Sequence, residues 1–213
     1  MKLIIFGASG LLGTRLVTEA LDRGHEVTAV ARDAARLDDR GGRVHTASAD
    51  ATDRDSVAAV AGGHDVAVSA VTQHEAPDVL VDAARGLLEG LARAGVPRLI
   101  SVGGAGSLEV APGQRLVDTP DFHDEWKPEA LAGARALEVF RQADGETPVE
   151  WSFISPGALL APGERTGRYR LGGDQLLVDE LGRSHISMED FAVAILDEVE
   201  EPRHPRQRFT AAY

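Results

Sequence analysis

The sequence predicts an α/β protein with a doubly wound, parallel β-sheet. Over residues 1–104, short apolar runs rich in β-branched residues alternate with stretches whose apolar residues recur at helical spacing. A glycine-rich turn also joins the first apolar run directly to the first helical stretch. Strands separated by helices form βαβ units, which build a parallel sheet with right-handed crossovers.

The elements of residues 1–104 follow this alternation in order. We expect strands over residues 3–6, 27–31, 44–49, 65–71 and 99–102. A helix begins after the glycine turn and ends at Gly24, and a longer one over residues 77–94 ends at Gly95, because glycine is a common helix stop. A shorter helix follows Thr52, which we predict as its cap.

The regular alternation of strands and helices ends at residue 104. Residues 105–128 form a long connection of the kind that is usually functional or mobile. A helix over 128–143 and a strand over 149–154 follow. Residues 155–184 are rich in Gly and Pro and predict an irregular segment with a hairpin near 166–171. Ser187 is expected to cap a last helix, before a final strand at 209–211.

No stretch of the chain has the composition of a linker. We therefore expect a single domain over residues 1–213, with residues 1–104 as its core. Residues 105–213 should supply a loop, helices and a small C-terminal segment that packs on the sheet.

Composition excludes several classes of protein. The 213-residue chain has no cysteine, which excludes a disulfide scaffold, a thiolate metal site and a cysteine nucleophile. Its formal charge of −12 repels phosphate backbones, so nucleic acid and anionic membranes are not expected partners. No apolar run is long enough to span a membrane, and the first residues lack a signal peptide's apolar region. We expect a soluble, cytoplasmic protein.

The glycine turn has the position and composition of a phosphate cradle. Gly7 permits the tight turn, Gly10 lets the backbone approach a pyrophosphate, and Gly13 lets the helix lie close to the strand. The spacing is GxxGxxG, and its place between a strand and a helix favours dinucleotide binding. The predicted fold is therefore Rossmann-like, and residues 1–104 are its dinucleotide-binding core.

The end of the second strand bears on the choice of cofactor. An acidic residue there binds the ribose 2′-hydroxyl of NAD, whereas an arginine accommodates the 2′-phosphate of NADP. Arg32 favours NADP(H), and the adjacent Asp33 leaves NAD(H) open. Asp50 follows the third strand and is a candidate to bind the adenine amino group or to cap the next helix.

These motifs resemble the atypical short-chain dehydrogenases/reductases, and among them the bacterial NAD(P)H-binding NADH–flavin reductase group. The similarity lies in GASGLLG, TAVARD, RLISVGGAG and SFISPGALLAPGERTG; that to flavin reductase/biliverdin reductase B is looser. The resemblance implies cofactor contacts from Gly7, Ser9, Gly10, Leu11, Leu12, Gly13, Arg32, Asp50, Ala70, Val71, Thr72, Gly103 and Gly104, with Ser155, Pro156 and Gly157 beside the nicotinamide.

The chain departs from the superfamily at its catalytic positions. Its two tyrosines, Tyr169 and Tyr213, do not form the family's YxxxK pair. The positions that match the flavin reductase's serine and lysine hold Gly104 and Glu138. His123 has YxxxK spacing to Lys127 and is the candidate proton donor, although a loop histidine packed on Trp126 is the simpler interpretation.

Without an acid–base pair, direct hydride transfer to a planar acceptor is the activity that the residues favour, because reduction of a flavin needs no positioned acid. The predicted function is an NAD(P)H-dependent reductase of the flavin-reductase type, with flavin as a substrate rather than a tightly bound group. A non-catalytic NADP-binding redox sensor is the alternative, and a nucleotide-sugar epimerase or dehydratase is a third.

We expect the acceptor, a small molecule, beside the ends of the fourth and fifth strands, since ligands bind at that edge of the sheet. The candidate residues are Thr72, Gln73, His74, Gly104 and Ala105. The seven histidines lack the spacing of a metal site, so no metal is expected. The sequence leaves a monomer and a homodimer equally open.

Overall fold

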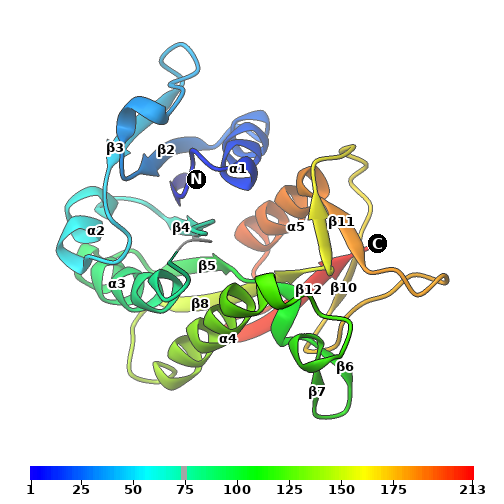
Figure 1. Ribbon diagram of the computed structural model, residues 1–213. Helices are drawn as coiled ribbons and strands as arrows, with labels where there is room; N and C mark the ends of the chain where they lie inside the picture. Colours follow the sequence, from blue (N-terminus) through cyan, green and yellow to red (C-terminus); the bar gives the residue numbers. More distant parts are fainter. Residues whose placement is uncertain (73–75) are drawn as a thin grey trace.

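The computed structural model describes residues 1–72 and 76–213, and an eight-stranded sheet runs through its centre (Figure 1). The strand order is β10-β12-β8-β5-β4-β1-β2-β3, and all neighbours pair in parallel except β10 and β12. The strands are β1 (Lys2–Phe6), β2 (Glu26–Ala31), β3 (Val44–Ser48), β4 (Val66–Ser69), β5 (Arg98–Val102), β8 (Glu150–Pro156), β10 (Arg170–Gly172) and β12 (Gln207–Ala212). The prediction of a doubly wound parallel sheet is confirmed, with one antiparallel edge strand added.

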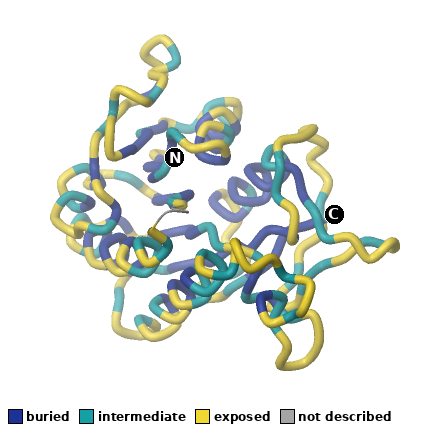
Figure 2. Tube along the Cα trace, in the orientation of Figure 1, coloured by how far each residue is buried: buried dark blue, intermediate teal, exposed yellow. Residues whose placement is uncertain are grey.

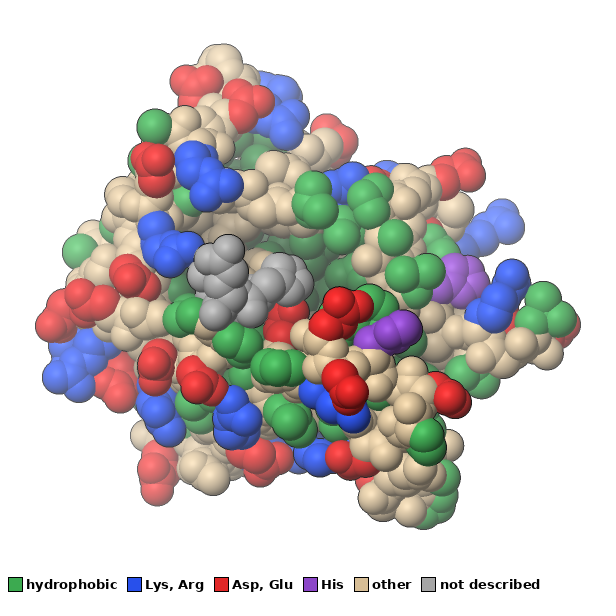
Figure 3. Space-filling model, viewed as in Figure 1, with side chains coloured by type: hydrophobic (Ala, Val, Ile, Leu, Met, Phe, Trp, Pro, Cys, Tyr) green, Lys and Arg blue, Asp and Glu red, His purple; other side chains and the backbone are tan. Residues whose placement is uncertain are grey.

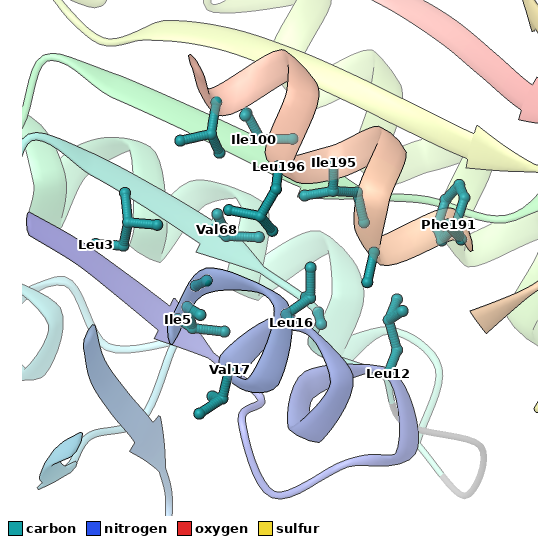
Figure 4. Packing of buried hydrophobic residues seen from close by; sticks show 14 of the residues in the cluster. Leu3, Ile5, Leu12, Leu16, Val17, Val68, Ile100, Phe191, Ile195 and Leu196 are labelled. Atoms are coloured by element: carbon teal, nitrogen blue, oxygen red, sulfur yellow. The ribbon is translucent and has the colours of Figure 1, made fainter. Parts of the chain in front are cut away.

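Helices cover both faces of this sheet. One face carries α1 (Leu11–Asp22) and α5 (Met188–Glu200); the other carries α2 (Arg54–Ala61), α3 (Val79–Ala94) and α4 (Lys127–Gln142). Each face has its own hydrophobic cluster, and the strands between them, apart from the edge strands β3 and β10, are buried along most of their length (Figure 2). In the first cluster, Leu16 of α1 and Leu196 of α5 meet over Val68 of β4 (Figure 4). No described helix is long and apolar enough to cross a membrane.

The cap of α2 differs from the prediction. The helix begins at Arg54, so the capping position falls on Asp53, whose carboxylate accepts the backbone N–H of Asp55 at 2.9 Å. Thr52 instead donates its hydroxyl to Asp50 at 2.8 Å. Thr52 is therefore not the cap, because the carboxylate next to the first helical residue takes that role.

The long connection over residues 105–128 contains short ordered elements. A small antiparallel hairpin lies between two 3₁₀ turns, and Leu108 and Val117 are buried beneath them. The elements are η2 (Ala105–Ser107), β6 (Glu109–Ala111), β7 (Gln114–Arg115), η3 (Leu116–Asp118) and η4 (Asp124–Trp126).

The segment over residues 155–184 has no hairpin at 166–171. β10 pairs with β12 instead, and β9 (Leu159–Ala161) pairs in parallel with β11 (His185–Ser187). The turn at 166–167 is fixed from outside the segment: the backbone N–H groups of Thr166 and Gly167 donate to Asp190 at 2.8 and 2.7 Å. The sequence gives no indication of these long-range partners, and so the hairpin prediction is wrong.

Asp190 connects three parts of the C-terminal half. It lies fully buried in the first turn of α5, behind the Ser187 cap, and also accepts the hydroxyl of Tyr213 at 2.7 Å. Burial opposes its ionisation, yet hydrogen bonds from Thr166, Tyr213 and Gly167 hold the pKa of its carboxyl below the usual value.

We predict that Asp190→Asn lowers the free energy of unfolding by about 1.5–3 kcal/mol at neutral pH, the range for hydrogen bonds to a charged group. A lowered pKa in the folded state stabilises the protein above the unfolded value and ceases to do so as pH falls through the folded value. The difference between wild type and variant should therefore shrink below about pH 4. Urea denaturation at several pH values measures this difference in the free energy of unfolding, with Asp22→Asn, at an exposed position, as the control. A difference that does not change with pH would contradict the role of the ionised Asp190 carboxylate.

Candidate functional site

Two adjoining cavities open at the carboxyl ends of the parallel strands. The polar cavity, about 520 Å³, lies over β1, β2 and β3 and is lined by residues such as Gly10, Arg32 and Asp50. The apolar cavity, about 570 Å³, lies over β4, β5 and β8, between α3 and α4. Val71 and Thr72 line both cavities. Hydrophobic side chains gather beside a hollow on this face (Figure 3).

The glycine turn between β1 and α1 is shaped by close backbone contacts. Gly7 has φ +76°, and a Cβ there would lie 2.6 Å from the carbonyl oxygen of Ala70. A Cβ on Gly13 would lie 2.1 Å from the carbonyl oxygen of Gly7. Both glycines are therefore required by the packing of the turn itself.

Gly10 is different, because the protein leaves room at this position. A Cβ there would meet only the Gly7 carbonyl oxygen, at 3.3 Å, and its φ of −80° suits any residue. Gly10 and Ser9 line the polar cavity. A side chain at Gly10 would fill space that the fold leaves open, as expected where a ligand approaches the backbone.

The first turn of α1 has the character of an anion site. It contains no acidic residue, and the N–H groups of Leu11, Leu12 and Gly13 lie where the helix supplies no acceptor. The side chain of Leu11 is exposed, whereas that of Leu12 packs in the core. Any contact that Leu12 makes with a cofactor is therefore through its backbone.

Two arginines line the far end of the polar cavity. Arg32 follows β2, and Arg36 ends the 3₁₀ turn η1 (Ala34–Arg36). The carboxylate of Asp33 accepts the N–H of Ala35 at 3.0 Å and caps this turn. Arg36 is not among the residues predicted from the sequence, because only the 3₁₀ turn brings it to the same cavity as Arg32.

Asp50 also lines the polar cavity. Its Oδ1 accepts the backbone N–H of Thr52 at 2.9 Å and the Thr52 hydroxyl at 2.8 Å. Asp50 therefore does not cap α2, and of its two predicted roles the contact with adenine is the one that this geometry permits.

The residues after β4 and β5 border the junction of the two cavities. Ala70 lines the polar cavity; Gly104 and Ala105 line the apolar one, and a Cβ on Gly104 would meet nothing within 4 Å. Gly103 is constrained by the protein, because a Cβ there would lie 2.0 Å from the ring of Phe153. Gln73 and His74, the other predicted acceptor contacts, lie outside the described residues.

Of the three residues predicted to lie beside the nicotinamide, two line the apolar cavity. Pro156 and Gly157 line the apolar cavity. Ser155 does not: it is fully buried, and its hydroxyl has no partner among the described residues. Alternation along β8 puts the Ser155 side chain on the same face of the sheet as Phe153, which lines the apolar cavity, so a contact of Ser155 with the nicotinamide stays a prediction.

His123 lines the apolar cavity, with its ring centroid 4.5 Å from that of Trp126. Lys127 donates to Asp124 at 2.6 Å and is not among the lining residues. Glu138, at the family's lysine position, accepts from Arg141 on the exposed side of α4. The YxxxK-like spacing of His123 and Lys127 therefore produces no pair at the cavity.

Comparison with known proteins points to one family. A family model described as NAD(P)H-binding matches residues 7–202. The uncharacterized protein YwnB of Bacillus subtilis is 39% identical, over 99% of this chain and 97% of its own. A 3-diazoavenalumate denitrifying reductase of a Streptomyces species is 28% identical, and the match covers 84% of this chain and 62% of that enzyme.

Solved structures agree in fold over the whole chain. A protein of Burkholderia pseudomallei described as a putative exported protein is 45% identical, with a TM-score of 0.89 and 100% of both chains covered. A putative epimerase of Bacteroides thetaiotaomicron is 41% identical, with a TM-score of 0.91 and coverage of 100% and 96%. A putative NADH-flavin reductase of Streptococcus pneumoniae is 32% identical, with a TM-score of 0.85 and coverage of 100% and 99%.

The contrast between Gly10 and Gly13 yields a paired prediction. Gly10→Val should abolish dinucleotide binding while lowering the free energy of unfolding by no more than about 1–2 kcal/mol, as for a poor N-cap. Gly13→Ala should instead lower stability strongly, because its Cβ meets backbone. Thermal unfolding and NADPH fluorescence titration separate the two effects. Undiminished NADPH affinity in folded Gly10→Val would refute the cradle.

Proposed function

The chain belongs to the NAD(P)H-binding family of atypical short-chain dehydrogenases/reductases, and we propose that it is an NADPH-dependent reductase that acts on a flavin or a related planar acceptor. The polar cavity fits the dinucleotide: a helix N-terminus without acidic residues faces it, Gly10 leaves room for the pyrophosphate, and two arginines stand at its end. NADPH, when bound, supplies the hydride.

The observation that carries the proposal is the chemical character of the apolar cavity. Both tyrosines are engaged elsewhere: Tyr169 donates to Asp197, and Tyr213 donates to Asp190 while its oxygen lies 2.8 Å from the Ser187 hydroxyl. Neither lines the cavity, and no lysine does so among the described residues. The cavity therefore has the walls to orient a planar ring but lacks the tyrosine–lysine pair that moves a hydroxyl proton.

The named relatives favour the same class of reaction. The Streptococcus protein is described as a putative NADH-flavin reductase and the Streptomyces relative as a denitrifying reductase. The epimerase description of the Bacteroides protein fits this chain less well, because epimerisation needs a positioned acid–base group. Here the protein's task is to bind two planar groups side by side and to exclude water between them.

Cofactor choice is tested at the arginines. We expect Arg32→Ala to weaken NADPH binding by about 1.5–3 kcal/mol, the range for hydrogen bonds to a charged group, and to leave NADH binding almost unchanged. Arg36→Ala should act in the same direction, since both side chains line one end of the cavity. Arg43→Ala, an exposed arginine outside the cavity, is the control. Equal losses for both cofactors, or a wild-type preference for NADH, would contradict the assignment.

Turnover tests the mechanism. NADPH oxidation should depend on added flavin, and His123→Ala should lower the rate less than about tenfold, whereas a general acid supplies about 10²–10⁴. The pH profile should show no bell near about 6.5, the usual histidine value. Gly104→Leu, which extends into open space, should block flavin reduction and spare NADPH binding.

Two outcomes would change the assignment. A loss near a thousandfold in His123→Ala would make His123 the proton donor, against direct transfer. NADPH binding without flavin reduction at any pH would support a non-catalytic sensor of NADP instead.

A further inference from the structure

The apolar cavity continues beyond the strand ends into a slot between α3 and α4. The slot exists because small side chains face each other across it: Ala83 and Ala84 on α3, Gly133 and Ala136 on α4. Its inner end is aromatic, with the rings of Phe140 and Phe153 5.7 Å apart between centroids.

Two serine hydroxyls form the floor of this slot. Ser69 of β4 and Ser101 of β5 are direct neighbours in the strand register, and both line the cavity. The two residues are 4% and 8% exposed, and the described part of the chain gives neither hydroxyl a hydrogen-bond partner, while neither oxygen is among the atoms sealed off without a partner. Two adjacent hydroxyls that are open to a cavity and not engaged by the protein can donate to, and accept from, a ligand with polar atoms along one edge.

The charges around the cavity indicate that the ligand carries no negatively charged group. Among the described residues that line it, none is a lysine or an arginine, whereas Asp121 and Glu129 are acidic. The whole chain also carries a formal charge of −12. A phosphate or carboxylate on the acceptor would face the negative charge of Asp121, and no lysine or arginine among the described lining residues is there to receive it.

We propose that the slot binds an uncharged planar ring system whose polar edge is held by the hydroxyls of Ser69 and Ser101, and that it disfavours phosphorylated acceptors. This inference rests on the proposed function, since it names the class of acceptor. It selects riboflavin over FMN, which differ only in the phosphate.

Binding can be read without turnover. Trp126 lines the cavity and is 56% exposed, whereas the other tryptophan, Trp151, is 2% exposed. Quenching of Trp126 fluorescence should give a Kd for riboflavin at least about fivefold lower than for FMN at low ionic strength, and the ratio should fall with added salt. The variant Trp126→Phe, which lacks the reporting tryptophan, gives the background quenching. Equal affinities at low salt, or tighter binding of FMN, would overturn the proposal.

The serines are tested with a matched buried serine. Ser69→Ala and Ser101→Ala should each raise the riboflavin Kd by about 3- to 10-fold and leave the Tm unchanged or higher, because no protein hydrogen bond is lost. Ser152 on β8 is equally buried but donates to the His204 carbonyl at 2.8 Å, and it does not line the cavity. Ser152→Ala should therefore lower the Tm and leave the riboflavin Kd unchanged.

Charge-reversal variants distinguish the effect of a charge at the cavity from the effect of the net charge of the chain. Asp121→Lys should lower the FMN Kd relative to that of riboflavin by several fold. Glu146→Lys, beyond the C-terminal end of α4, makes the same change in net charge away from the cavity and should leave the ratio unaltered.

The failures of the two proposals are distinguishable. A fall in Tm with unchanged riboflavin affinity in both Ser69→Ala and Ser101→Ala would overturn the role of the serines, whatever the turnover. Riboflavin binding that depends on both serines, without NADPH-dependent reduction, would contradict the proposed reductase and support the slot as a ligand site.

Discussion

The close packing of the first turn against the neighbouring strand governs the rest of this structure. Gly7 lies against the Ala70 carbonyl at the end of β4, and Gly13 lies against Gly7 itself, so that neither position has room for a Cβ. This contact fixes the start of α1 at the point in the sheet where the strand order reverses, between β1 and β4. The first-turn N–H groups of α1 are thereby directed at the edge where the two cavities meet, beside Val71 and Thr72.

The two cavities differ in the polarity of the residues that line them. The polar cavity combines a helix N-terminus with Arg32 and Arg36, and suits a polyanionic dinucleotide. The apolar cavity has aromatic and small side chains, acidic residues and the hydroxyls of Ser69 and Ser101, and suits an uncharged ring. Within a chain of strongly negative charge, the arginines and the helix N-terminus offset repulsion for the cofactor alone. We therefore expect the dinucleotide in the polar cavity and the proposed acceptor in the apolar one, on opposite sides of one junction.

Buried carboxylates on α1 and α5 hold the other wall of the apolar cavity in place. Arg165 donates to Glu19 of α1 at 2.7 and 2.8 Å, and its hydrogen bonds hold the pKa of that carboxyl below the usual value. Asp190 of α5 receives the backbone of the turn at 166–167. The irregular segment over residues 155–184 is thus fixed to the two helices that cover one face of the sheet. Pro156 and Gly157, which line the apolar cavity, lie at the start of that segment.

The sequence by itself determined the features whose causes are local. Apolar periodicity predicted the alternating strands and helices, and the glycine spacing after β1 predicted the cradle, because turn geometry and helix periodicity depend on neighbouring residues. Tertiary structure decided the features that join distant segments: the anchoring of residues 163–167 by Asp190 and Glu189, the approach of Arg36 to Arg32 through a 3₁₀ turn, and the slot where Ser69 and Ser101 meet beneath α3 and α4. Each serine alone is an ordinary strand residue. Only the pairing of β4 with β5, and the gap left by small side chains on two helices, turns them into the floor of a cavity.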